Sequence, residues 1–141
     1  MTERFVVDSS VAVNWMLDQP LSAAARSFLA ERPEMVAPAW MRLELANALW
    51  KAFMSGLITR DVARLLHSGF DLAPIEFVDD PRLGRSTLAL AGSLRHPVSD
   101  CCYIALSVAE GARLVTADRG LMELVNSHVI DGQAVWLGEW A

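Results

Sequence analysis

The sequence predicts an α/β fold, a three-layer α/β/α sandwich in which helices cover both faces of a central parallel sheet. Short apolar segments alternate with helical segments along the chain, which is the pattern of parallel strands joined by crossover helices. These strand-like segments show little alternation of polar and apolar residues, as expected for strands buried on both faces. The chain has 141 residues, of which 53% are hydrophobic and 21% charged. We therefore expect residues 1–141 to form one domain with a substantial core.

Two strands and four helices are expected in the first half of the chain. The run at 5–7 is β-branched and aromatic, which favours a strand, and Ser9 can cap the helix that follows. Pro20 breaks the chain before a second helix, and Pro38 suits the first turn of the third helix. Gly56 is suited to end that helix. The expected elements are a strand at 5–7, helices at 9–17 and 22–31, a strand at 35–37, and helices at 39–55 and 59–70.

Strands and helices continue to alternate in the second half. Asp80 and Pro81 mark a helix start, Ser99 is expected to cap the next helix, and Gly111 ends it. The expected elements are a strand at 75–78, helices at 82–94 and 100–110, a strand at 113–116, a helix at 119–126, and strands at 129–130 and 134–137.

The charge balance argues against one class of function. The chain has 17 acidic and 12 basic residues, a formal net charge of -5 and an isoelectric point near 5.1. It therefore lacks the broad basic surface with which proteins bind duplex nucleic acid through bulk charge. A nucleic-acid enzyme whose acidic residues bind a metal ion is still compatible with this composition.

Cysteine content and hydropathy bear on the compartment. The two cysteines, Cys101 and Cys102, are adjacent and cannot easily reach disulfide geometry, which favours buried thiols in a reducing compartment. The first residues lack the long apolar stretch of a signal peptide, and no uncharged run of about 18 apolar residues predicts a membrane span. We therefore expect a cytoplasmic protein that does not enter a membrane.

Three aspartates fall where an open parallel sheet forms its binding sites, at the carboxyl ends of the strands. Asp8 follows the first strand, Asp118 follows the strand at 113–116, and Asp100 opens the helix that leads into that strand. Right-handed crossovers place such helix starts at the same edge as the strand ends. The three carboxylates are therefore expected to converge on one crevice.

Glu44 is a fourth candidate, because it shares a mostly apolar helix face with Trp40 and Ala48. Burying this carboxylate without a partner is unfavourable or raises its pKa, and a cation would remove that cost. Hard divalent ions such as Mg²⁺ or Mn²⁺ suit a group of carboxylate oxygens. Apart from these four acids, 13 acidic residues remain against 12 basic ones, so most of the excess acidity belongs to this group.

Each of these acids also has an ordinary structural interpretation. Asp100 and Asp118 can serve only as helix caps, Asp8 can be a turn residue, and Glu44 can be solvated. The joint placement of the four residues is what favours a metal site.

Four segments around these acids resemble the PIN-domain family, most closely the VapC-type ribonuclease toxins of bacterial toxin–antitoxin pairs. Each segment is a weak signal alone, but together they occur in the family's order and span nearly the whole chain. The segments are Val-Val-Asp-Ser-Ser-Val-Ala at 6–12 with Trp15, Leu-Glu-Leu-Ala-Asn-Ala-Leu at 43–49, Ser-Asp-Cys-Cys-Tyr-Ile-Ala-Leu-Ser at 99–107 and Leu-Val-Thr-Ala-Asp-Arg at 114–119.

The resemblance implies the α/β/α fold and a specific activity. It implies a Mg²⁺- or Mn²⁺-dependent endoribonuclease, the toxin of a type II toxin–antitoxin pair, which hydrolyses RNA phosphodiester bonds with water activated by the cation. Many members carry a further acid where this chain has Gly120, so a fifth metal ligand is not expected here. The residues that match the family's site are the catalytic and metal-binding acids Asp8, Glu44, Asp100 and Asp118, and the supporting hydroxyl residues Ser10 and Thr116.

Partners follow from the resemblance and from the substrate's charge. The resemblance implies a homodimer and a VapB-like antitoxin whose tail blocks the site. An RNA substrate also needs cationic side chains for its phosphates, and Arg119 beside Asp118 and Arg42 near Glu44 are the nearest candidates. His96 is expected to be a loop residue rather than a catalytic base.

Two other classes of function are weaker alternatives. A catalytically inert PIN-like module could bind RNA or protein, although the complete set of four acids argues against it. A phosphoacceptor signalling domain needs a lysine at a late strand end, and the only lysine, Lys51, falls in a predicted helix.

Overall fold

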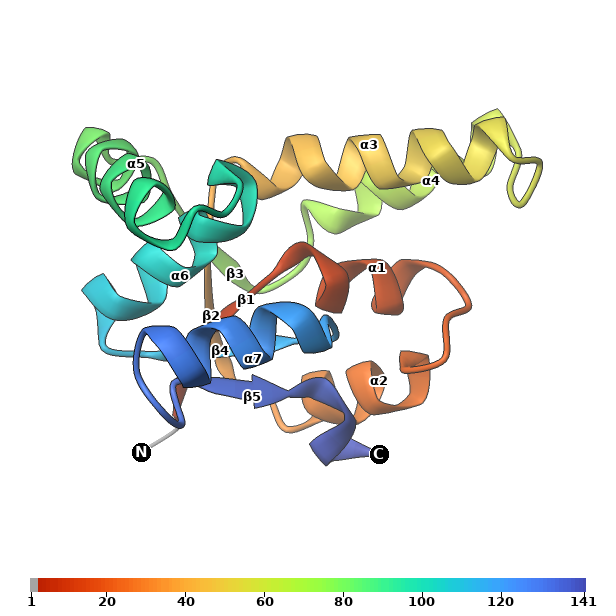
Figure 1. The fold of residues 1–141 in the computed structure, drawn as a ribbon. Coiled ribbons are helices and arrows are strands. Elements are labelled where there is room, and N and C mark those ends of the chain that lie inside the picture. The colour runs from red at the N-terminus through yellow and green to blue at the C-terminus, as the bar shows by residue number, and fades with distance from the viewer. Residues whose placement is uncertain (1–2) are drawn as a thin grey trace.

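The central sheet is parallel and has its first strand in the middle (Figure 1). The computed structural model describes residues 3–141, and within them the sheet has five strands. The strands are β1 (Arg4–Val7), β2 (Glu34–Pro38), β3 (Ile75–Val78), β4 (Arg113–Thr116) and β5 (Ala134–Trp136). Their order is β3-β2-β1-β4-β5, and every pairing is parallel. The chain therefore moves outward from β1 to β3 and then crosses to the other side of β1.

Helices cover both faces of this sheet. They are α1 (Ser9–Met16), α2 (Ser22–Ala30), α3 (Met41–Met54), α4 (Arg60–Phe70), α5 (Pro81–Leu94), α6 (Val98–Glu110), α7 (Arg119–His128) and the short 3₁₀ helix η1 (Leu137–Trp140). Because right-handed crossovers reverse sides when the chain reverses direction, α1 to α4 and α5 to α7 belong to opposite layers. Helix α6 packs against β1, β2 and β4, and α7 packs against β4 and β5. The predicted α/β/α sandwich is confirmed.

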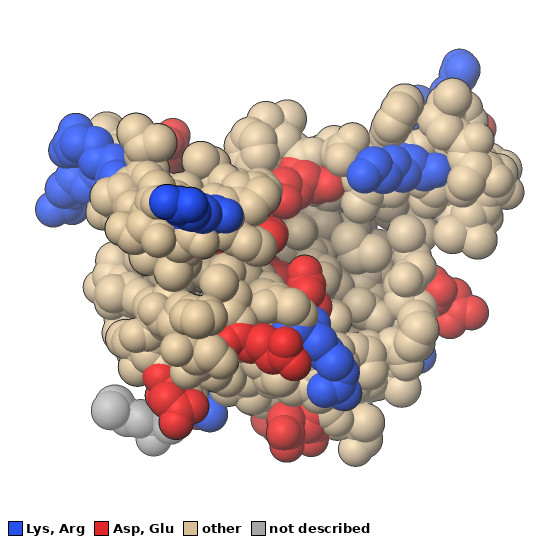
Figure 2. Space-filling view, viewed as in Figure 1, with Lys and Arg blue, Asp and Glu red and all other residues tan. Residues whose placement is uncertain are grey.

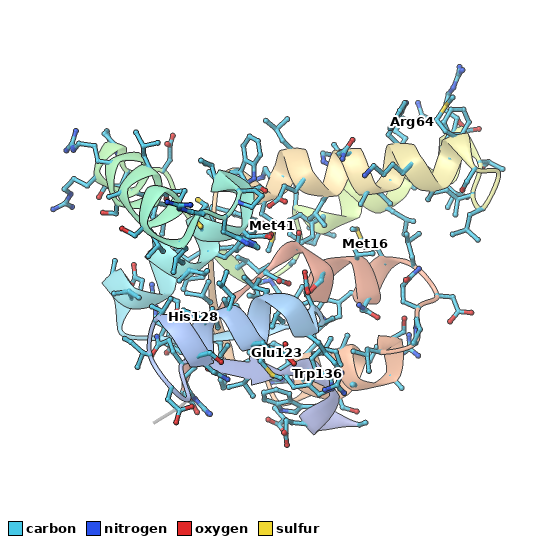
Figure 3. All side chains as sticks on the ribbon, viewed as in Figure 1. Met16, Met41, Arg64, Glu123, His128 and Trp136 are labelled. Carbon is cyan, nitrogen blue, oxygen red and sulfur yellow. The ribbon has the colours of Figure 1, made fainter. Side chains whose placement is uncertain are left out.

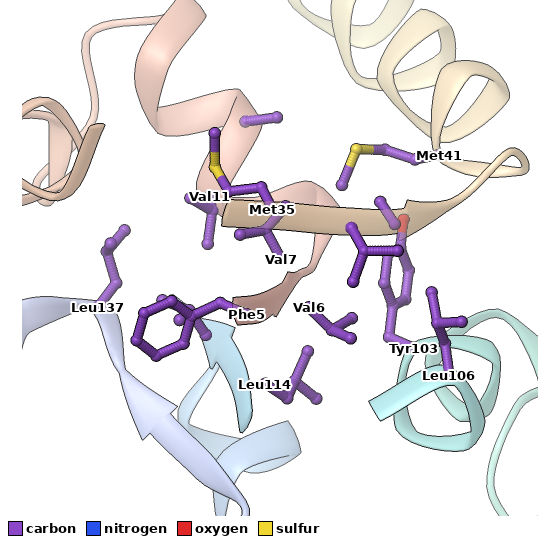
Figure 4. Packing of buried hydrophobic residues seen from close by; sticks show 14 of the residues in the cluster. Phe5, Val6, Val7, Val11, Met35, Met41, Tyr103, Leu106, Leu114 and Leu137 are labelled. Atoms are coloured by element: carbon purple, nitrogen blue, oxygen red, sulfur yellow. The ribbon is translucent and has the colours of Figure 1, made fainter. Parts of the chain in front are cut away.

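The core lies where the central strands meet the helices. Val6, Val7 and Leu114 are fully buried, and Figure 4 shows Tyr103 and Leu106 of α6 facing this part of the sheet. Burying a side chain of this size contributes roughly 1.5–3 kcal/mol. These contacts hold β1 and β4 firmly, so the residues that follow both strands emerge at a well-defined edge.

Most elements agree with the sequence prediction. The strands at 75–78 and 113–116 have the predicted bounds, and the other matching elements differ by one or two residues at an end. Gly56 follows α3 with a φ of 82°, a left-handed conformation that glycine adopts without strain, as its predicted role at the helix end requires.

The strand expected at 129–130 was wrong. Val129 instead ends α7, and its amide donates to the carbonyl of Val125 over 3.0 Å. The amide of Ile130 also donates to that carbonyl over 3.0 Å. These two β-branched residues form a helix end because the carbonyls of the last turn need donors, which outweighs their strand propensity.

Ser9 was expected to cap the first helix, but Asp8 caps α1 and Ser9 is its first residue. Two further helix starts also differ from the prediction. Pro38 ends β2 rather than opening a helix, and α3 begins at Met41 without a side-chain cap. Ser99 lies inside α6, which begins one residue earlier, at Val98, with Pro97 at the capping position. A proline lies near both helix starts. Because proline fixes its own φ and restricts the residue before it, it shifts the position at which the helix begins.

Within residues 3–141, no helix has the length and the apolar character needed to span a membrane.

Candidate active site

Four acids predicted from the sequence lie just beyond strand ends or in the first turn of a helix. Asp8 directly follows β1, and Asp118 lies two residues after β4. Asp100 and Glu44 lie in the first turns of α6 and α3. All four therefore belong to the carboxyl edge of the sheet or to helices that start there. Figure 2 shows one side of the molecule, and acidic side chains gather in a hollow near its centre.

Asp8 is buried, with 4% of its surface exposed, and both of its oxygens accept hydrogen bonds. Oδ1 caps α1 by accepting from the amide of Ser10 over 2.9 Å, and it also accepts from the Ser10 hydroxyl. Oδ2 accepts from Oγ1 of Thr116 over 2.6 Å. Burial raises the pKa of Asp8 to about 6, and these hydrogen bonds oppose that rise only in part. The site thus holds a buried carboxylate whose charged form is disfavoured by its surroundings.

Ser10 and Thr116 connect Asp8 to the end of β4. The Ser10 hydroxyl accepts from the amide of Ala117 over 2.9 Å, and Oγ1 of Thr116 accepts from the amide of Asp118 over 2.9 Å. Asp118 is exposed and caps α7, where its Oδ1 accepts from the amide of Leu121 over 3.2 Å. Two hydroxyls therefore set the relative positions of two of the acids.

Glu44 and Asp100 interact through their charges. Glu44 is half-buried, and Oε1 accepts from the Tyr103 hydroxyl over 2.6 Å. Burial is the largest cause that raises the pKa of Glu44, and the negative charge of Asp100 raises it further, while the Tyr103 hydrogen bond lowers it. Asp100 is therefore close enough to destabilise the charge of Glu44.

Tyr103 is a site residue that the sequence analysis missed. Its phenol is buried, and its pKa is raised by burial, by the hydrogen bond to Glu44 and by the charges of Glu44 and Asp8. This hydroxyl therefore stands between acids from two different elements. A signal was available in the sequence, because Tyr103 lies three residues after Asp100 and must share its helix face.

His96 contacts one of the four acids, which the sequence did not indicate. It lies in the loop before α6, as predicted, but its Nε2 is 2.8 Å from Oδ2 of Asp100. The two residues are four positions apart, and one of them lies outside the helix, so the i,i+4 rule did not indicate the contact. His96 thus orients Asp100 from the loop.

The two arginines predicted to bind substrate lie in different surroundings. The guanidinium of Arg119 stacks on Trp136, with its central carbon 4.1 Å from the ring centroid. Arg42 stacks on Phe77 at 3.9 Å, and its Nε is 3.5 Å from Oδ1 of Asp71. Arg42 is therefore held by groups on β3 and at the end of α4 rather than by the four acids.

The donor set at this edge fits a hard divalent cation. Within residues 3–141, no three His, Cys, Asp or Glu side chains are close enough to form a ready-made metal site. Mg²⁺ does not require one, because it is usually held by one or two carboxylates and keeps several waters. Asp8 is a buried carboxylate, and the charge of Asp100 raises the pKa of Glu44, so a divalent cation beside either group would stabilise the charged form of that group. The ligands offered are carboxylate oxygens, which favour Mg²⁺ or Mn²⁺ over softer metals.

Known proteins resemble this chain in sequence family and in fold. The family model of the PIN domain matches residues 5–125, a range that includes all four acids. No curated protein matches the sequence. The structure of PAE2754 from Pyrobaculum aerophilum has a TM-score of 0.71 and 23% identity, covering 99% of this chain and 94% of that one. FitAcB from Neisseria gonorrhoeae has a TM-score of 0.60 and 15% identity, covering 86% and 93%. At these identities the two structures establish the fold alone.

Proposed function

Because the chain belongs to the PIN-domain family, we propose that it is a Mg²⁺- or Mn²⁺-dependent endoribonuclease. PIN domains are generally nucleases that use divalent metal ions. The finer assignment to RNA rests on the similarity to VapC-type toxins in the four segments around the acids. We also propose that residues 1–141 act as one domain, since the main hydrophobic cluster extends from Phe5 to Leu137.

The observation that carries this proposal is the set of contacts around Asp8. Its buried carboxylate is joined to Asp118 through Thr116, and its charge reaches Tyr103, the hydroxyl that donates to Glu44. Acids that are far apart in the sequence therefore share one electrostatic environment. Such an environment is unfavourable without a cation and favourable with one.

The chain's own residues divide the chemistry between them. We assign Asp8, Asp100 and Asp118 to holding the cation, one or two of them as direct ligands and the others through its water molecules, with Ser10 and Thr116 fixing the orientation of Asp8. When bound, the cation lowers the pKa of a water molecule and polarises a phosphoryl oxygen.

Glu44 has a separate part in the proposal: it either binds the cation or orients the attacking water. Its carboxylate, which accepts a hydrogen bond from the Tyr103 hydroxyl, would accept a proton from the attacking water. The proton of the attacking water passes to Glu44, the new bond to phosphorus displaces the 3′ oxygen, and that oxygen takes up a proton from solvent. The products are a 5′-phosphate and a 3′-hydroxyl.

We further propose that the protein is the toxin of a type II toxin–antitoxin pair, acts in the cytoplasm, forms a homodimer and binds a VapB-like antitoxin. Support for protein partners comes from exposed apolar side chains along α3. Leu43, Trp50 and Met54 are 66%, 56% and 62% exposed. Their spacing of seven and four residues places them on one side of the helix. Exposed apolar side chains that share one side of a helix are typical of interaction sites.

Cleavage of a single-stranded RNA by the purified protein tests the proposed function. We expect cleavage with Mg²⁺ or Mn²⁺, none with EDTA, and 5′-phosphate ends on the products. Asp8→Asn should keep the fold and lose cleavage, whereas Asp18→Asn, which makes the same charge change at an exposed loop position, should stay active. Undiminished metal-dependent cleavage by Asp8→Asn would overturn the assignment.

The main alternative is a catalytically inert PIN-like module that binds RNA or protein. The position of Gly120, where many family members have an acid, is the feature that favours it. An inert module would bind RNA without cutting it, and Mn²⁺ binding would be absent or unaffected by Asp8→Asn.

A further inference from the structure

The groove between α7, β5 and η1 has a volume of about 570 Å³, and its lining includes Arg119, which directly follows Asp118. We propose that it is a subsite for one nucleotide of single-stranded RNA, and that Trp136 positions Arg119 to bind the phosphate of that nucleotide. This inference rests on the proposed ribonuclease function and names where its substrate is held. The residues that carry it are Arg119, Met122, Trp136, Glu139 and Trp140, all of which line the groove.

One end of the groove opens at the edge where the acids gather. Trp136 pairs in register with Thr116, so it ends β5 at the level where β4 ends. Arg119 directly follows Asp118, the capping residue of α7. Figure 3 shows Trp136 and His128 toward opposite ends of α7, with Trp136 near the end where the helix begins. A phosphate held here would therefore be close to one held by the acids.

Arg119 is placed to bind that phosphate. Stacking on Trp136 covers one face of the guanidinium, but its N–H donors lie in the plane and stay free to bind two phosphate oxygens. Within residues 3–141 Arg119 forms no ion pair, whereas Arg113, in the same groove, is paired with Glu3. Among these residues, no carboxylate therefore competes with a ligand for the guanidinium of Arg119.

Gly138 leaves room for the Trp136 indole because it has no side chain. A Cβ added at Gly138 would lie 2.6 Å from Cδ1 of Trp136 and closer still to its Nε1. Any side chain at this position would therefore displace the ring, and Arg119 would lose the surface on which it stacks. The position of the arginine thus depends on a glycine in η1.

The interior of the groove suits a nucleoside better than a second phosphate. Met122 and Trp140 offer apolar surface to a base or a ribose. The carboxylate of Glu139 lines the same space and would repel another phosphate. A base can enter only when it is unpaired, so the subsite selects single-stranded RNA.

Binding of a fluorescent eight-nucleotide single-stranded RNA tests the subsite without requiring cleavage. The Asp8→Asn protein in Mg²⁺ buffer serves as the starting protein. Adding Arg119→Gln should weaken binding about tenfold, as expected for lost charge-assisted hydrogen bonds. It should also reduce the salt slope of the binding constant by about 0.7, the value for one phosphate contact on a single strand. Arg26→Gln, at an exposed position on α2 without an ion pair, is the matched control and should change neither quantity.

The positioning role of Trp136 is tested by a double-mutant cycle. Trp136→Leu and Gly138→Ala should each weaken binding several-fold, and each should do so much less once Arg119→Gln is present. Gly92→Ala, where an added Cβ meets no atom within 4 Å, is the control for the glycine change. A purely structural role for Trp136 would instead give effects that multiply, with an unchanged salt slope in Trp136→Leu.

The outcomes separate this inference from the proposed function. In the cleavage-competent protein, Arg119→Gln should raise KM about tenfold and leave kcat within about twofold, because the contact is made before the reaction begins. If the wild-type protein does not cut RNA but the binding results hold, the subsite stands and the nuclease assignment fails. If Arg119→Gln binds RNA as tightly as its parent, the subsite is wrong whatever the cleavage assay gives.

Discussion

The Thr116 hydroxyl donates to Oδ2 of Asp8 over 2.6 Å, although the two residues are 108 positions apart in the chain. Both groups are buried. The same hydroxyl accepts from the amide of Asp118 over 2.9 Å. One side chain at the end of β4 thus holds the acid that follows β1 and the loop that carries a second acid.

Replacing Thr116 with valine should therefore lower both stability and activity. Valine fills the same space but leaves an Asp8 oxygen and the Asp118 amide without a partner, at a cost of about 1–3 kcal/mol in the free energy of unfolding. Urea denaturation measures this cost, and the RNA assay should show weaker cleavage. Thr116→Ser keeps the hydroxyl and should recover most of the activity. Equal activity of the valine and serine variants would show that the hydroxyl does not matter.

Tyr103→Phe should shift the pH dependence of cleavage. The Tyr103 hydrogen bond now lowers the pKa of Glu44, so its loss should raise that pKa and move the acidic limb of the pH–rate profile to higher pH. The ring stays in place, which limits the stability loss to about 1 kcal/mol. In a Glu44→Gln background the same change should produce no shift. A shift that persists there would assign the effect to another group.

Asp8 should make the metal-free protein less stable as pH rises. Its pKa is raised from 3.8 to about 6, so the folded state retains a proton that the unfolded chain releases near pH 4. This contribution is fully present below about pH 4 and is lost as pH rises through about 6. In EDTA, Asp8→Asn should therefore gain roughly 1–3 kcal/mol relative to wild type between pH 4 and pH 7. Asp18→Asn, made at an exposed position, should show no such trend. If the difference in the free energy of unfolding between Asp8→Asn and wild type did not change with pH, burial would not raise the pKa of Asp8.

Local patterns were enough to predict the fold and the placement of the acids. The run at 5–7 ends in Asp8, and that run is β-branched and aromatic, so strand and carboxylate were both readable from adjacent residues. Asp100 and Asp118 could be placed for the same reason, since helix starts and strand ends share an edge in any right-handed parallel sheet.

Contacts between distant segments could not be read in this way. The stacking of Arg42 on Phe77 depends on which side of α3 the residue faces and on how α3 lies against β3. The Glu44–Tyr103 hydrogen bond joins residues 59 positions apart and depends on two helices from opposite layers. The prediction for Val129 and Ile130 failed for a different reason. Their β-branched side chains favour a strand, but their amides donate to the carbonyl of Val125 and complete the last turn of α7.

Mn²⁺ binding to the purified protein tests the central claim most directly, because it asks whether the acids hold a cation before any substrate is involved. Calorimetric titration of wild type, Asp8→Asn and Asp18→Asn supplies the comparison. Wild type and Asp18→Asn should bind Mn²⁺ with the same affinity, and Asp8→Asn should bind at least about tenfold more weakly, the change that loss of one charged ligand produces. Equal Mn²⁺ affinity in all three proteins would contradict a metal centre built around Asp8.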